Sequence, residues 1–168
     1  MTDFSDALDQ RLAENEELAK RRKDAEAEMD RIRQEEQEAA AAISQAQRDR
    51  HAELADHLKD VADQLKASAP NSFIVRSGWT ESGEEFVASM KTRQMSPKRE
   101  LLVEVDRDDD EVLCRWTSDL GNAVEVWRLL EMSPEMVTHM VLQVADDTAW
   151  TGRRPPPFPT GAPADDQA

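Results

Sequence analysis

The first 67 residues carry apolar side chains at a spacing that predicts one long helix. Two series of positions recur every 11 residues along this stretch. The first series is Ala7, Leu18, Met29, Ala40, His51 and Ala62, and the second is Ile32, Ile43, Leu54 and Leu65. An 11-residue repeat corresponds to about 3.67 residues per turn, which is close to the α-helical value. Both series therefore lie along one nearly straight face.

A helix this polar requires a partner, because most helical stability comes from packing an apolar face. Towards the end of the helix the apolar residues take ordinary coiled-coil spacing. We therefore predict a helix-pairing surface, called the apolar stripe, with His51 as a polar break in it. The stripe consists of Leu18, Met29, Ile32, Ala40, Ile43, His51, Leu54, Leu58, Val61 and Leu65. The partner is a second copy or another coiled-coil protein, and the spacing leaves the number and orientation of the helices open.

Two features of the helix have alternative interpretations. The four alanines at 39–42 surround the stripe, where small side chains let a partner helix approach closely. Alternatively, they only maintain helicity, because alanine is the best helix former. Arg21 interrupts the second series within a basic cluster at 20–23. Such a cluster is typical of an exposed, charged helix face, with polyanion contact as the alternative.

The helix is expected to end at "SAPNS", because Pro70 cannot continue the backbone ladder. Neither glycine nor proline precedes that residue, and Thr2 or Asp3 can cap the start. The predicted organisation is a helix or coiled coil over 1–67 and a hinge over 68–72. A small domain over 73–150 and a tail over 151–168 follow.

The small domain shows the alternation of apolar and polar residues that indicates antiparallel strands. A short edge strand is expected at 73–76. The segment 84–93 fits a strand, with a helix as the alternative. Three further strands are expected at 99–106, 111–118 and 123–130, joined by loops at "RDDD" and "DLGN".

A second helix begins after Ser133, which is a favourable cap, with Pro134 at the first helical position. Its apolar positions predict that it covers one face of the sheet. The expected fold class is α+β: a long N-terminal coiled-coil helix, a small antiparallel β-meander, a C-terminal helix and a disordered Pro-rich tail.

The tail "TGRRPPPFPTGAPADDQA" is rich in proline, so we expect disorder with polyproline II character. Arg153, Arg154 and Phe158 could dock on a partner or on an acidic rim of this protein itself. The alternative is a spacer that keeps the domain soluble.

The net charge of −15 makes nucleic acid and anionic membranes poor partners for the surface, and favours basic proteins. We expect neither a signal peptide nor a membrane span, and a single cysteine fits a reducing compartment. The chain is therefore expected to be cytoplasmic.

Sequence motifs for catalysis are missing. The three histidines lack partners at ligand spacing, Cys114 falls among core positions, and "DRDDDE" has calcium-loop composition without the required glycine. We expect no cofactor, no metal and no enzymatic activity.

Two hypotheses of function follow. The first is a non-catalytic assembly or adaptor protein that pairs through its helix and displays the small domain. The second is an acidic binding module, either a chaperone for a basic partner or a nucleic-acid mimic that inhibits a DNA-binding protein. Salt should weaken only the second kind of binding steeply.

Overall fold

The computed structural model describes residues 2–160. The chain forms two units, Met1–Ser44 and Gln45–Ala168. The first unit is part of helix α1 (Thr2–Ser68), and the second, called the compact unit, contains the rest of that helix and all later elements.

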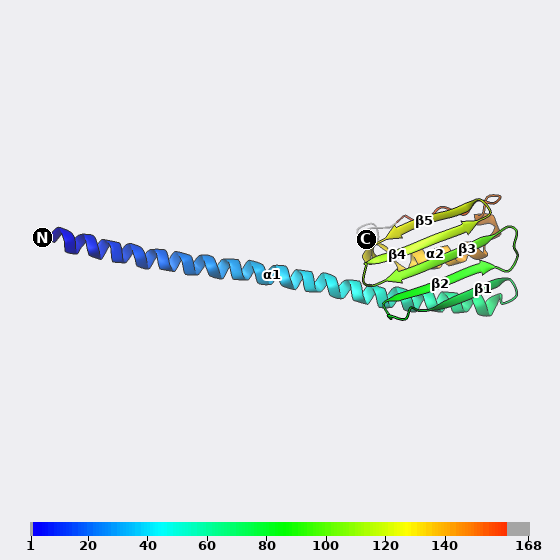
Figure 1. The fold of residues 1–168 in the computed structure, drawn as a ribbon, viewed down its shortest axis with the longest axis horizontal. Helices are drawn as coiled ribbons and strands as arrows, with labels where there is room; N and C mark the ends of the chain where they lie inside the picture. Colours follow the sequence, from blue (N-terminus) through cyan, green and yellow to red (C-terminus); the bar gives the residue numbers. More distant parts are fainter. Residues whose placement is uncertain (1, 161–168) are drawn as a thin grey trace. The chain divides into compact units, whose positions relative to one another are not determined.

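The compact unit is built on a five-stranded antiparallel meander in the order β1-β2-β3-β4-β5 (Figure 1). Its strands are β1 (Phe73–Trp79), β2 (Glu85–Thr92), β3 (Arg99–Asp106), β4 (Glu111–Ser118) and β5 (Gly121–Trp127). Each strand pairs with its neighbour in sequence, so the meander and the strand at 84–93 are confirmed. The last strand ends earlier than expected, and residues 129–131 form a 3-10 turn, η1 (Leu129–Glu131).

Alternation along the strands separates a buried face from an open one. In β3 the buried residues are Leu101, Val103 and Val105, and the register places Trp116, Cys114 and Val112 of β4 beside them. These side chains form the sheet half of the core.

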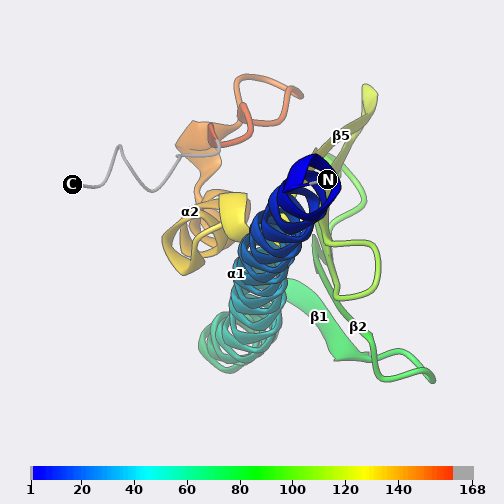
Figure 2. The ribbon, with the colours of Figure 1, turned by 90° about the vertical axis from the view of Figure 1, so that its left-hand side faces the viewer.

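Two helices cover the buried face, and Figure 2 shows them on the same side of the sheet. They are α2 (Pro134–Ala145) and the part of α1 that belongs to the compact unit. Leu54, Ala55, Leu58 and Ala62 of α1 are fully buried in the same core as the strands. The Arg50 guanidinium also donates a hydrogen bond to the Met132 carbonyl just before α2.

The start of α2 confirms the expected cap. The Ser133 hydroxyl accepts a hydrogen bond of 3.3 Å from the Met136 amide, and Pro134 occupies the first turn. After α2, a second 3-10 turn, η2 (Asp147–Ala149), leads into the C-terminal segment.

The compact unit begins within the long helix, at Gln45, and not after it. Of residues 68–72, expected to be a hinge, Ser68 ends α1 and 69–72 form a tight turn inside this unit. The Ala69 carbonyl accepts hydrogen bonds from the Ser72 and Phe73 amides at 3.1 and 3.2 Å. The sequence could not locate this boundary, because one helix crosses it without interruption.

Candidate interaction surfaces

The helix of the first unit exposes its whole circumference, including the first half of the apolar stripe. Every residue from Asp3 to Ala46 is exposed. Leu18, Met29, Ile32 and Ile43 are between 44 and 59 % exposed, although each is a large apolar side chain. Phe4, Leu8 and Leu12 extend the exposed apolar surface towards the N-terminus. An apolar surface of this kind is typical of a protein-interaction site.

The second half of the apolar stripe faces the sheet of the same chain. Leu54 and Leu58 are fully buried, and Val61 and Leu65 are partly buried against the same core. The assignment of these four residues to a partner helix is therefore corrected. Helical spacing shows which face of a helix is apolar, but it does not show whether a helix or a sheet covers that face.

His51 likewise belongs to the core of the compact unit. Its Nε2 atom lies 2.9 Å from the Glu84 carbonyl oxygen, and only 5 % of the residue is exposed. The Trp79 ring lies 5.6 Å from the imidazole, centroid to centroid. The expectation of a polar break facing a partner helix is corrected, because the loop between β1 and β2 satisfies this polar group.

The C-terminal segment up to Thr160 packs against the sheet. The Phe158 ring stacks on Trp116 with centroids 6.0 Å apart, and it meets the edge of Trp127 at 5.8 Å. Pro156 is buried beside it in the sequence. Disorder is therefore the wrong expectation for residues 151–160, and the rest of the predicted tail, 161–168, lies outside the described residues.

One of the two tail arginines meets an acidic group of this protein. Arg153 lies 3.8 Å from the Asp119 carboxylate, in the turn between β4 and β5, whereas Arg154 is exposed and closes a backbone bridge with Thr151. Phe158, predicted to dock on a partner or on this protein itself, thus packs against the hydrophobic core of its own chain.

Carboxylates gather at one end of the sheet, where the β1–β2 and β3–β4 loops meet. A hydrogen bond between Glu84 and Asp108 raises the pKa of Glu84, and the charge on Asp108 adds to this. The pKa of Glu85 is also raised, first by partial burial and then by Glu104. Such crowding favours the approach of a cation or a basic group, and Arg107, 3.9 Å from the Glu84 carboxylate, already supplies one.

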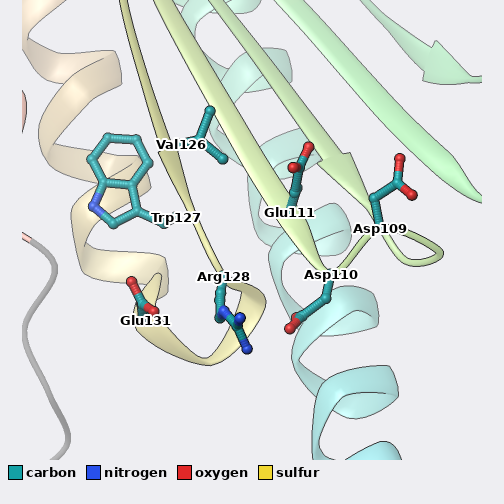
Figure 3. Close-up of a pocket in the computed structure, with 7 residues that line it drawn as sticks. All are labelled: Asp109, Asp110, Glu111, Val126, Trp127, Arg128 and Glu131. Atoms are coloured by element: carbon teal, nitrogen blue, oxygen red, sulfur yellow. The ribbon is translucent and has the colours of Figure 1, made fainter.

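The β3–β4 loop also borders a concave region of about 540 Å³. Figure 3 shows the Asp110 carboxylate turned towards Arg128, whereas Asp109 points away. Asp110 accepts hydrogen bonds from the Gln47 amide group and the Leu129 backbone, both at 3.2 Å. These contacts tie the loop to α1 and η1, so the structural role of Asp110 accounts for its position.

A second concave region, of about 590 Å³, contains two arginines that already have partners in the chain. Arg99 forms an ion pair with Asp147 at 2.5 Å and lies over the Trp150 ring. Arg93 donates a hydrogen bond of 2.9 Å to the Pro70 carbonyl. Asp147 compensates the charge of Arg99, whereas the Arg93 guanidinium is held in place by a neutral carbonyl and keeps its positive charge.

The open face of the sheet mixes apolar and charged side chains. Its apolar members are Ile74, Val87, Leu102, Leu113, Val124 and Val126, and the register alternates them with Arg76, Glu104 and Arg115. Val124 and Val126 on the edge strand are 51 and 46 % exposed. This face is a second surface on which the compact unit could be recognised.

Side chains that could act as nucleophiles, bases or metal ligands are buried, already hydrogen-bonded or far from one another. Burial raises the pKa of the Cys114 thiol, which therefore stays protonated. The His57 Nε2 atom lies 2.6 Å from the Thr138 hydroxyl, between α1 and α2. Within residues 2–160, no three His, Cys, Asp or Glu side chains are arranged to hold a metal ion. Over the same residues, the helices lack the long apolar run that crossing a bilayer requires.

The chain matches no protein-family model, no curated protein and no solved structure. The features of this chain that bear on its function are therefore its two exposed surfaces and its acidic end.

Proposed function

We propose that the protein is a non-catalytic assembly or adaptor protein that pairs through residues 2–44 and displays the compact unit. The observation that supports this is the exposure of every residue from Asp3 to Ala46, with large apolar side chains recurring on one face. A helix of this length gains little stability from propensity alone and more from packing of its apolar face. A second helix supplies that packing.

The compact unit has a hydrophobic core of its own. It buries its part of α1 without a partner, so its folding does not depend on association. All four tryptophans belong to it, at positions 79, 116, 127 and 150. Tryptophan fluorescence therefore reports on the compact unit alone, and light scattering reports on pairing.

Light scattering coupled to size exclusion tests the proposal on the full chain. We expect a mass that is a multiple of one chain at micromolar concentration, and a single-chain mass for Ile32→Asp, because the new carboxylate would be buried in the pairing surface. Tryptophan fluorescence should stay unchanged in this variant. A wild-type mass of one chain across this concentration range would contradict self-association.

Two matched alanines separate a surface effect from a helix effect. Ala40 lies on the apolar stripe, and Ala27 lies on the opposite side of the same helix by its helical angle. Ala40→Asp and Ala27→Asp make the same change in charge and helix propensity. Only Ala40→Asp should lower the mass, and equal effects of the two would show that the stripe is not the pairing surface.

A second candidate function is an acidic binding module for a basic partner, favoured by the net charge of −15 and by the carboxylates that gather around Glu84 and Glu85. Oligolysine provides a simple probe. Under this hypothesis its binding should fall steeply with added salt and should weaken on Glu84→Gln. Binding that Glu84→Gln leaves unchanged would indicate a general effect of the net charge.

A further inference from the structure

We infer that the pairing partner is a second copy of this chain, and that the two helices run antiparallel with residue i of one opposite residue 47 − i of the other. This inference rests on the proposed function and specifies its partner. It comes from the order of apolar and charged residues along the exposed helix of the first unit.

Twelve positions, eight of them apolar, follow one face of this helix at spacings of three and four residues. We call them the seam: Phe4, Ala7, Arg11, Asn15, Leu18, Arg22, Ala25, Met29, Ile32, Glu36, Ala40 and Ile43. The succession of spacings is the same in both directions along the chain. A reversed copy can therefore place every seam position opposite another seam position, and the side chains at those positions decide between this orientation and a parallel one.

The reversed alignment also pairs suitable side chains. Phe4 meets Ile43, and Leu18 meets Met29, each twice in a symmetric dimer. Residues 5–8 of one copy lie opposite the four alanines at 39–42 of the other. Small side chains there leave room for Phe4 and Leu8, which gives the alanine run a packing role.

Charge distinguishes this arrangement from a parallel one. In a parallel, in-register pair, each seam residue meets its own copy, so Arg11, Arg22 and Glu36 would all face a like charge. In the antiparallel pair Arg11 meets Glu36, and Arg22 meets Ala25. The basic cluster 20–23 then lies opposite 24–27, which contains Asp24 and Glu26.

The two charged partners are available for this contact. Ion pairs that the structure describes within residues 2–44 join Arg21 to Glu17, Arg31 to both Glu28 and Glu35, and Arg33 to Asp30. Arg11 and Glu36 take part in none of these. The seam also ends at Ile43, next to the boundary of the compact unit at Gln45.

Cysteine cross-linking determines the orientation. Leu18→Cys and Met29→Cys are prepared as separate full-length proteins, and the buried Cys114 provides an unreactive background. Under oxidation we expect a disulfide-linked dimer only when the two proteins are mixed. In either protein alone, the two new thiols of a dimer lie about 16 Å apart along the helix, too far for a disulfide.

Charge exchange tests the register independently. Arg11→Glu and Glu36→Arg should each raise the dissociation constant on the order of tenfold, since each variant creates two like-charge pairs per dimer. Combining the two restores opposite charges, so the double variant should return to within about threefold of the wild type. In a parallel pair, where each residue meets itself, the double variant would show no such recovery.

The outcomes distinguish failure of self-association from failure of the antiparallel register. A single-chain mass for the wild type overturns the proposed self-association and the antiparallel pair with it. A dimer in which Leu18→Cys alone cross-links as well as the mixture overturns the antiparallel 47 − i pair and leaves the proposed function intact. A dimer that forms no disulfide in the mixture, or shows no recovery in the double charge variant, overturns the 47 − i register.

Discussion

The most direct structural prediction concerns Phe158, because the composition of its segment suggests disorder and the structure shows packing. Replacing Phe158 with alanine removes a ring that contacts Trp116 and Trp127 at centroid distances of 6.0 and 5.8 Å. The ring is partly buried, so about 100 Å² of apolar surface is lost from the core, which corresponds to about 2.5 kcal/mol at about 25 cal/mol per Å². The lost aromatic geometry adds about 0.5–1.5 kcal/mol.

We therefore expect Phe158→Ala to lower the free energy of unfolding by about 3 kcal/mol, given these two contributions. Urea titration followed by tryptophan fluorescence measures this, and Trp116 and Trp127 should also become more accessible to acrylamide. Met95→Ala is the control, because Met95 is an equally apolar residue that is 86 % exposed. It should change stability by no more than about 0.5 kcal/mol. A similarly small effect of Phe158→Ala would refute the packed segment and restore the spacer interpretation.

Two further predictions concern the acidic end of the sheet. Asp110→Ala should cost about 2 kcal/mol in urea unfolding, because it removes two hydrogen bonds and places alanine at a φ of 52°. Asp110→Asn should cost less, since asparagine tolerates this backbone conformation and keeps one acceptor oxygen. The pKa of Glu85 is raised in the folded state, so its contribution to stability falls as pH rises through that value. Glu85→Gln should therefore stabilise the protein at pH 7, by a few tenths of a kcal/mol after discounting for solvent screening. Below the unfolded-state pKa the substitution should have no effect. Equal effects at both pH values would show that charge crowding is not the cause.

The sheet could be predicted from the sequence because one face of it is buried and the other is open. Because of that difference, apolar residues occupy every second position of a strand, as do Leu101, Val103 and Val105. Polar loops separate the strands. The cap of α2 is equally local, since Ser133 and Pro134 specify its start whatever surrounds it.

The contacts that the sequence did not reveal are those between distant segments. The Nε2 atom of His51 is satisfied by the carbonyl of Glu84, which lies 33 residues away in a loop. Phe158 packs on Trp116 and Trp127 of the sheet, although the prolines around it suggest an unpacked chain. No sequence pattern near His51 or Phe158 indicates these contacts, because the partner residues come close only when the chain has folded.

The two parts of the apolar face differ in their density of apolar residues, and in the proposed pair this difference sets how strongly the helices associate. Where α1 packs on the sheet, Leu54, Leu58, Val61 and Leu65 follow at four-, three- and four-residue spacing, and two of them are fully buried in a single chain. Along the seam, large apolar residues are interrupted by Arg11, Asn15, Arg22 and Glu36, so a pair of seams buries less apolar surface per turn and depends partly on charge. A dense surface holds the fold together, and a sparse, charged one favours reversible pairing. We therefore expect the compact unit to remain folded at dilutions and salt concentrations at which the helices separate.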